Sequence, residues 1–139
     1  MADTILLVED DRNQQILYHT ELSAEGYDVL VASTGKEAIQ KVESESPDVV
    51  VMDIAMPEMD GIEALGKILA KDSQMPIILN TAYASFKDNF MTWAADAYVV
   101  KSSDMGELKD AIAEVLDPTE QSQGAIQEKQ DGASSYRDK

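Results

Sequence analysis

The sequence has 139 residues, enough for one domain with a hydrophobic core but too few for two ordinary ones. Its 27 acidic and 11 basic residues give a net charge of −16, so the surface repels phosphate backbones and direct nucleic-acid binding is not expected. With no cysteine, no apolar run long enough for membrane insertion and no secretory-signal pattern, we expect a cytoplasmic protein without disulfides.

Short apolar runs alternate five times along the chain with segments of helical periodicity. The predicted strands are residues 5–8, 27–31, 49–52, 76–79 and 97–100. Helices are predicted after each of them, around residues 16–22, 38–42, 65–69, 86–95 and 108–116. This alternation is typical of an α/β fold in which five helices cover both faces of a five-stranded parallel sheet.

Four of the predicted helices are preceded by side chains suited to capping. Thr34, Asp60 and Asp104 each stand three residues before a glutamate, and Asp11 stands three residues before a glutamine. An acceptor side chain followed at this spacing by Glu or Gln is the pattern of a capping box. The sequence therefore predicts that these helices begin close to those four residues.

The composition changes after Asp117. Residues 118–139 are rich in Gln, Ser, Gly and charged side chains, and Ile126 and Tyr136 are their only large apolar or aromatic residues. We expect residues 1–117 to form the single domain and residues 118–139 to form a polar, disordered tail. A short partner-binding peptide within the tail is the alternative.

Polar residues follow most of the predicted strands at their carboxyl ends, where α/β sheets carry their functional sites. They are Glu9, Asp10 and Asp11 after the first strand, Asp53 after the third, Asn80 and Thr81 after the fourth, and Lys101 after the fifth. Crowded carboxylates repel each other unless a cation or a proton intervenes, and oxygen ligands without nearby His or Cys favour Mg²⁺. Such a site suits phosphoryl transfer, in which an aspartate can serve as the nucleophile.

Four segments of the chain carry a resemblance to a known family. They are residues 5–11 (ILLVEDD), residues 51–61 (VMDIAMPEMDG), the pair Thr81-Ala82, and residues 98–101 (YVVK). In this order and spacing, over residues 3–117, they resemble the receiver domains of bacterial two-component response regulators. The resemblance implies a flavodoxin-like (βα)5 fold with strand order 2-1-3-4-5.

The same resemblance implies the roles of individual residues. They are Asp53 as phosphoacceptor, Asp10, Asp53 and the backbone carbonyl of Ala55 as Mg²⁺ ligands, Glu9 beside those ligands rather than on the metal, Lys101 as phosphate-binding ammonium, and Thr81 and Tyr98 as switch residues. The implied phosphoryl donor is a sensor histidine kinase or a histidine phosphotransfer protein. A downstream protein target would contact the face formed by residues 86–100 and the last helix. On this basis we expect a phosphorylation switch without an output domain, and not a turnover enzyme.

Two other functions remain open at this point. The first is a receiver-like binding module that works without phosphorylation, although all the implied site residues are present. The second is a phosphohydrolase with an aspartate nucleophile, which would carry a second Asp where Ala55 stands.

One residue departs from the family pattern. In the family, the lysine is often followed by a proline in a cis peptide, but here Ser102 follows Lys101, so the geometry of the Lys101–Ser102 bond stays open.

Overall fold

The strands of the protein form one parallel sheet. The structure, a computed structural model, describes residues 2–53, 61–82, 95–102 and 104–117. The strands are β1 (Thr4–Val8), β2 (Asp28–Ala32), β3 (Val49–Met52), β4 (Ile77–Thr81) and β5 (Ala97–Val100). They lie in the order β2-β1-β3-β4-β5 with parallel pairing throughout, which confirms the predicted topology.

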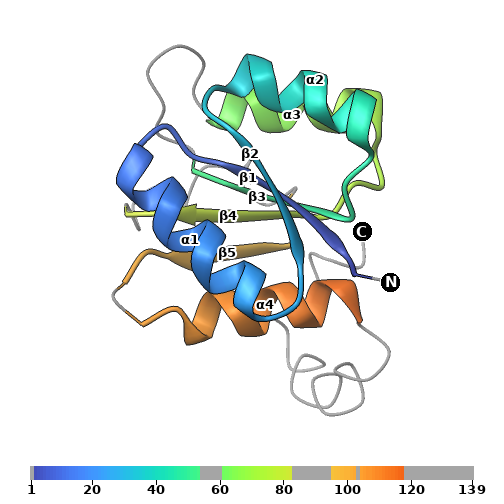
Figure 1. Cartoon of the computed structure of the whole chain (residues 1–139). Coiled ribbons are helices and arrows are strands. Elements are labelled where there is room, and N and C mark those ends of the chain that lie inside the picture. The colour runs from blue at the N-terminus through green and yellow to red at the C-terminus, as the bar shows by residue number, and fades with distance from the viewer. Residues whose placement is uncertain (1, 54–60, 83–94, 103, 118–139) are drawn as a thin grey trace.

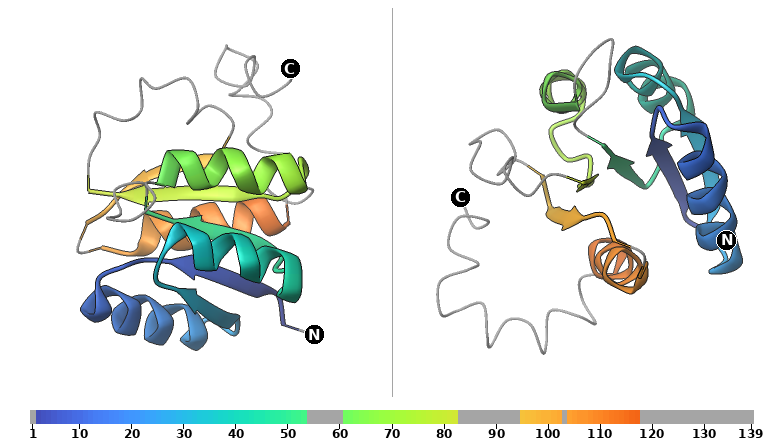
Figure 2. Two further views of the ribbon diagram at one scale, coloured as in Figure 1. Left: turned by 90° about the horizontal axis from the view of Figure 1, so that it is seen from above. Right: turned by 90° about the vertical axis from the view of Figure 1, so that its left-hand side faces the viewer.

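Helices cover both faces of this sheet (Figures 1 and 2). Those on one face are α2 (Gly35–Glu45) and α3 (Gly61–Lys71), and those on the other are α1 (Arg12–Ala24) and α4 (Gly106–Leu116). Four of the five predicted helices are therefore confirmed. The fifth, over residues 86–95, falls almost wholly outside the described residues, as do Ala55, Asp60 and the tail 118–139. Within the described part of the chain, no helix is long and apolar enough to span a membrane.

Two apolar clusters, one on each face of the sheet, form the core. Alternate residues of each strand point to opposite faces, so the unbroken apolar runs of β1, β3 and β4 supply both clusters. The cluster under α2 and α3 includes Leu6, Val8, Val50, Met52, Leu65, Ile68, Ile77 and Leu79. The cluster under α1 and α4 includes Ile5, Leu7, Leu22, Val49, Val51, Ile78, Leu108 and Ile112. Burying each such side chain stabilises the folded state by about 2 kcal/mol. This burial fixes the register of the strands and thereby the positions of the residues that follow them at the carboxyl edge of the sheet.

The predicted caps are confirmed at two helices and shifted at a third. Asp11 accepts hydrogen bonds from the amides of Asn13 and Gln14 at 2.9 and 3.4 Å. Thr34 Oγ1 accepts from the Glu37 amide at 3.1 Å, while Glu37 Oε1 accepts from the amide that precedes the cap. Asp104 is not the cap residue of α4, because that helix begins only at Gly106. Its Oδ1 still accepts from the Gly106 amide at 2.8 Å and so satisfies the first free N–H of the helix.

Three of the five strands differ at their ends from the sequence-based expectation: β1 begins one residue earlier, at Thr4, β2 lies one residue later, and β4 runs from Ile77 to Thr81. The second strand begins at Asp28 rather than Tyr27, because the Tyr27 amide donates to Leu22 O across a turn in which Gly26 has a φ of 101°. The fourth strand continues through Asn80 and Thr81, which pair with the last residues of β5. Both side chains are polar, so the pattern of apolar residues alone ended the strand too early.

Candidate functional site

The register of the sheet brings the predicted site residues to one edge. Val8 is the pairing partner of Met52, so the next residues, Glu9 and Asp53, leave their strands side by side, and the Asp53 amide donates to the Val8 carbonyl at 3.1 Å. Thr81 pairs in the same way with the last residue of β5, and the Lys101 amide donates to the Thr81 carbonyl at 2.7 Å. Four chain segments that are distant in the sequence thus end next to one another.

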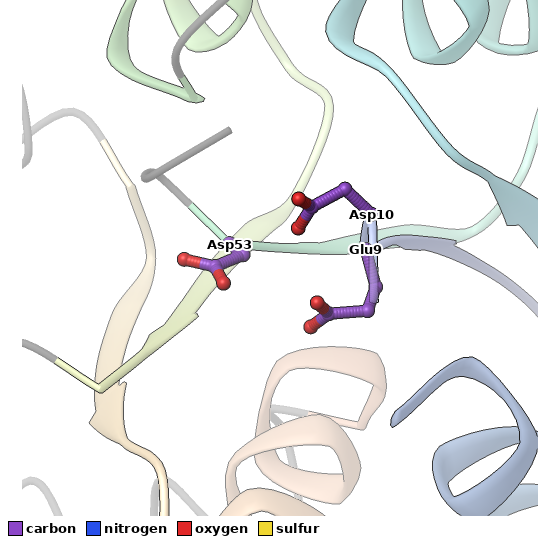
Figure 3. A group of neighbouring side chains, drawn as sticks. All are labelled: Glu9, Asp10 and Asp53. Carbon is purple, nitrogen blue, oxygen red and sulfur yellow. The ribbon is translucent and has the colours of Figure 1, made fainter. Parts of the chain in front are cut away.

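Three carboxylates form a cluster at this edge. Glu9, Asp10 and Asp53 each offer an oxygen, and these oxygens all lie within 4.8 Å of one another. Figure 3 shows the carboxyl groups of Glu9 and Asp10 turned toward the side on which Asp53 lies. Glu9 and Asp53 are buried, with 2% and 9% of their surfaces exposed, whereas Asp10 is exposed. The cluster is therefore reached from solvent on the Asp10 side.

Lys101 joins the two buried carboxylates. Its Nζ donates to Glu9 Oε1 at 2.7 Å and to Asp53 Oδ2 at 2.9 Å. All three side chains are at most 12% exposed, so water screens these contacts far less than it screens a surface ion pair. Lys101 thus places a positive charge directly beside the predicted phosphoacceptor.

Burial and the ammonium act in opposite directions on the titration of this cluster. Burial raises the pKa of Glu9, and the hydrogen bond and charge of Lys101 offset part of that rise. Burial also opposes the charged form of Lys101, but the hydrogen bonds to Glu9 and Asp53 outweigh it and raise the pKa of the ammonium. Lys101 therefore remains charged at neutral pH and can hold anionic groups.

The remaining predicted residues lie beside the cluster or outside the described part of the chain. Thr81 is fully buried at the end of β4, next to the Lys101 backbone. Tyr98 is half-buried and packs against the apolar cluster under α2 and α3. The peptide bond between Lys101 and Ser102 is trans, which settles the geometry that the sequence left open. Ala55 lies outside the described residues.

One contact of this edge was missed by the sequence-based reasoning. The side-chain nitrogen of Gln15 donates to the backbone carbonyl of Glu9 at 2.6 Å and to Ser33 Oγ at 3.1 Å. In the sequence, Gln14 fits the capping-box spacing after Asp11, whereas Gln15 fits no motif. Only the packing of α1 against the sheet shows that the Gln15 side chain reaches the Glu9 carbonyl.

The donor set of the cluster fits a small, hard cation. With its carboxylates ionised, the cluster of three acids and Lys101 carries a net charge of −2, which a divalent cation would neutralise. All ligand atoms available in the cluster are carboxylate oxygens, and Mg²⁺ prefers oxygen ligands. The residues present therefore fit the Mg²⁺ site that the sequence predicts.

Comparison with known proteins agrees with this geometry. The family described as the response regulator receiver domain matches residues 5–113. The response regulator TrrA of Thermotoga maritima, crystallised with Mg²⁺ and beryllium fluoride, is 41% identical, with a TM-score of 0.80 over 82% of this chain and 99% of its own. TrrA crystallised with the histidine kinase ThkA matches with a TM-score of 0.78, at 41% identity, over 82% of this chain and 98% of its own.

Curated relatives match over the same region. The probable transcriptional regulator ycf27 of Guillardia theta is 40% identical over 116 residues, which is 82% of this chain but 45% of the relative. The chain spans at most about half the length of the first curated relatives that it matches. The similarity thus concerns the receiver part of those longer proteins.

Proposed function

The chain belongs to the response regulator receiver family of two-component signalling, and from that premise we propose that it accepts a phosphoryl group on Asp53 in a Mg²⁺-dependent reaction. The observation that carries this proposal is the place of the Asp53 carboxylate. It lies 2.9 Å from the Lys101 ammonium on one side and next to the Glu9–Asp10 pair on the other. A nucleophile with a fixed cation and metal-binding oxygens beside it is the arrangement that phosphoryl transfer needs.

In the proposed reaction, an Asp53 carboxylate oxygen forms a bond to phosphorus while the bond between phosphorus and the donor's leaving group breaks. Asp10, Asp53 and the Ala55 carbonyl would hold Mg²⁺, with Glu9 beside them, and the metal would supply charge neutralisation for the phosphoryl oxygens. Lys101 would offer its ammonium to another of those oxygens, and the hydroxyl of Thr81, at the end of the neighbouring strand β4, would move to donate to a third. The leaving group takes its proton from solvent or from the donor protein.

The proposed phosphoryl donor is a sensor histidine kinase or a histidine phosphotransfer protein. The crystal of TrrA with the kinase ThkA supports this choice, since TrrA has the same fold and 41% identity to this chain. The protein then acts as a phosphorylation switch and not as a turnover enzyme. The proposed surface for its downstream partner consists of β5, α4 and the segment 86–95, the last of which lies almost wholly outside the described residues.

The proposed function predicts self-phosphorylation from a small-molecule donor. Wild-type protein incubated with acetyl phosphate and Mg²⁺ should gain the mass of one phosphoryl group, located at Asp53 by peptide mapping after borohydride reduction. Removing Mg²⁺ with EDTA should slow the reaction by about two orders of magnitude, because the metal contributes several kcal/mol of charge stabilisation. Equal labelling with and without Mg²⁺ would contradict the proposal, and continuous release of phosphate far beyond one equivalent would favour a phosphohydrolase.

The switch that follows phosphorylation is proposed to begin at Thr81. A phosphoryl group adds charge of about −1.5 to −2 and new acceptor oxygens, which attract the Thr81 hydroxyl. Movement of that hydroxyl toward the phosphate vacates space beside β5, and Tyr98, only half-buried in its present position, can turn inward to fill it. The change would then spread to the proposed partner surface.

Thr81→Ala is expected to accept phosphate at Asp53 but to transmit it weakly, because the hydroxyl that contacts the phosphoryl group is gone. The measurement is the amide NMR shift across residues 83–105 on addition of beryllium fluoride with Mg²⁺. Those shifts should be several times smaller than in wild type. Thr20→Ala, an exposed Thr→Ala change on α1, should keep the wild-type shifts. Identical shifts in wild type and Thr81→Ala would show that Tyr98 and β5 do not respond through Thr81.

A further inference from the structure

Gln15, near the start of α1, connects two loops. One is the acidic turn after β1, which consists of residues 9–11, and the other is the loop before α2, which contains Ser33. The side-chain nitrogen of Gln15 donates to the Glu9 carbonyl at 2.6 Å and to Ser33 Oγ at 3.1 Å. A backbone carbonyl oxygen only accepts hydrogen bonds, so the amide nitrogen and not the amide oxygen must face it. Both N–H groups of this amide are therefore used, one on each side of the connection.

The bond to Glu9 acts on the neighbouring metal ligand. The Glu9 carbonyl lies in the same planar peptide unit as the amide nitrogen of Asp10, so its direction fixes the backbone from which the Asp10 side chain projects. The Asp10 carboxylate itself is exposed and accepts no hydrogen bond from the residues that the structure describes. Within the described part of the chain, its position therefore depends on the backbone around it.

The other end of the connection is anchored on a rigid element. The Ser33 amide donates to Glu37 Oε1 at 2.8 Å, and the Glu37 amide donates to Thr34 Oγ1 at 3.1 Å. Ser33 is thus held to the capped N-terminus of α2, and its hydroxyl is a fixed acceptor for Gln15. Through Gln15 and Ser33, the acidic turn is therefore tied to a helix that packs on the sheet.

The acidic turn needs such a restraint before a cation arrives. Three carboxylates within 4.8 Å of one another repel, and Lys101 contacts only Glu9 and Asp53 among them. Without a restraint on its backbone, the Asp10 side chain would relax outward into solvent. Binding a cation would then include the cost of bringing it back.

We propose that Gln15 is a positioning residue for the Mg²⁺ site, whose side-chain amide holds the Glu9–Asp10 peptide and ties it through Ser33 to α2. The inference rests on the proposed Mg²⁺ site but not on the phosphorylation of Asp53. Partners of metal ligands commonly change metal affinity by about ten-fold or more when they are removed. Gln15 should therefore set the affinity of the site without touching the metal.

The test is a Mg²⁺ titration of full-length Gln15→Met without any phosphoryl donor, followed through the amide NMR signals of residues 9–11. Methionine keeps the length and helix preference of glutamine but cannot donate, so the dissociation constant should rise about ten-fold. Ser33→Ala should raise it less, since one of the two bonds remains. In acetyl phosphate assays, the Mg²⁺ concentration for half-maximal rate should rise for Gln15→Met while the rate at saturating Mg²⁺ stays near that of wild type.

Gln14→Met is the matched control, because Gln14 stands one residue earlier on α1. Its Oε1 is buried without a hydrogen-bond partner in the described part of the chain, so its removal takes no bond from the acidic turn. Gln14→Met should bind Mg²⁺ as wild type does. Wild-type affinity in folded Gln15→Met, or equal weakening in both glutamine variants, would overturn the inference. If Gln15→Met does not fold, exposed Ser33→Ala decides, and wild-type affinity there overturns it as well. Failure of wild type to phosphorylate, with weakened Mg²⁺ binding in Gln15→Met, would refute only the proposed function.

Discussion

Asp53→Asn is expected to abolish phosphorylation by acetyl phosphate while leaving the protein folded. Asparagine has nearly the shape of aspartate, but its neutral amide oxygen is a much poorer nucleophile than a carboxylate. Among the described residues, Glu9 is the one other buried carboxylate that contacts Lys101. Lys101 keeps Glu9 as a partner, so the ion pair inside the site is reduced but not lost. Intact-mass measurement after incubation with donor and Mg²⁺ should show no phosphoryl adduct.

Asp28→Asn is the matched control for this experiment. Asp28 is an exposed aspartate at the start of β2, on the opposite edge of the sheet from Asp53, so the same chemical change there should leave labelling at the wild-type level. An adduct that persists at full level in Asp53→Asn would show that another residue, Glu9 first among them, is the acceptor. Loss of labelling in both variants would mean that the change in charge, and not the nucleophile, governs the reaction.

Most of the fold follows from local patterns in the sequence. The runs 49–52 and 97–100 coincide with β3 and β5. All four residues of β3 are buried, as an unbroken apolar run predicts, whereas β5 lies at the edge of the sheet and only Val99 of its residues is buried. Asp11 and Thr34 cap their helices as predicted, since capping depends on residues only two or three positions apart. The end of β4 was missed because the burial of Thr81 depends on β5, which lies far away in the sequence.

The membership of the site was predictable, but its internal contacts were not. The sequence places Glu9, Asp53 and Lys101 at strand ends, and parallel pairing must bring those ends to one edge. That one ammonium bridges both buried carboxylates depends on side-chain direction and depth, which have no sequence pattern. The same is true of Gln15, whose role follows from a single inward-facing amide.

Lys101→Met should both slow phosphorylation and destabilise the protein when Mg²⁺ is absent. The substitution keeps an apolar stem of similar length but leaves Glu9 and Asp53 facing each other without their common cation. Because these side chains are at most 12% exposed, the loss resembles the breaking of a buried ion pair and should lower the unfolding free energy by about 3 kcal/mol. The phosphorylation rate at saturating Mg²⁺ should fall about 100-fold, as it does when one fixed group that stabilises transition-state charge is removed.

Lys71→Met separates this effect from the general loss of a lysine. Lys71 pairs with Glu43 at 2.8 Å, a contact as short as those of Lys101, but its side chain is 45% exposed and that of Glu43 is 57% exposed. Solvent screens such a pair, so urea unfolding of Lys71→Met should show a change of about 1 kcal/mol at most. Added Mg²⁺ should recover part of the stability of Lys101→Met, because a cation that binds only the folded site favours that state, and should do nothing specific for Lys71→Met. Equal losses in the two variants would mean that burial does not strengthen the Lys101 contacts, and a Lys101→Met protein that phosphorylates at the wild-type rate would remove Lys101 from the reaction.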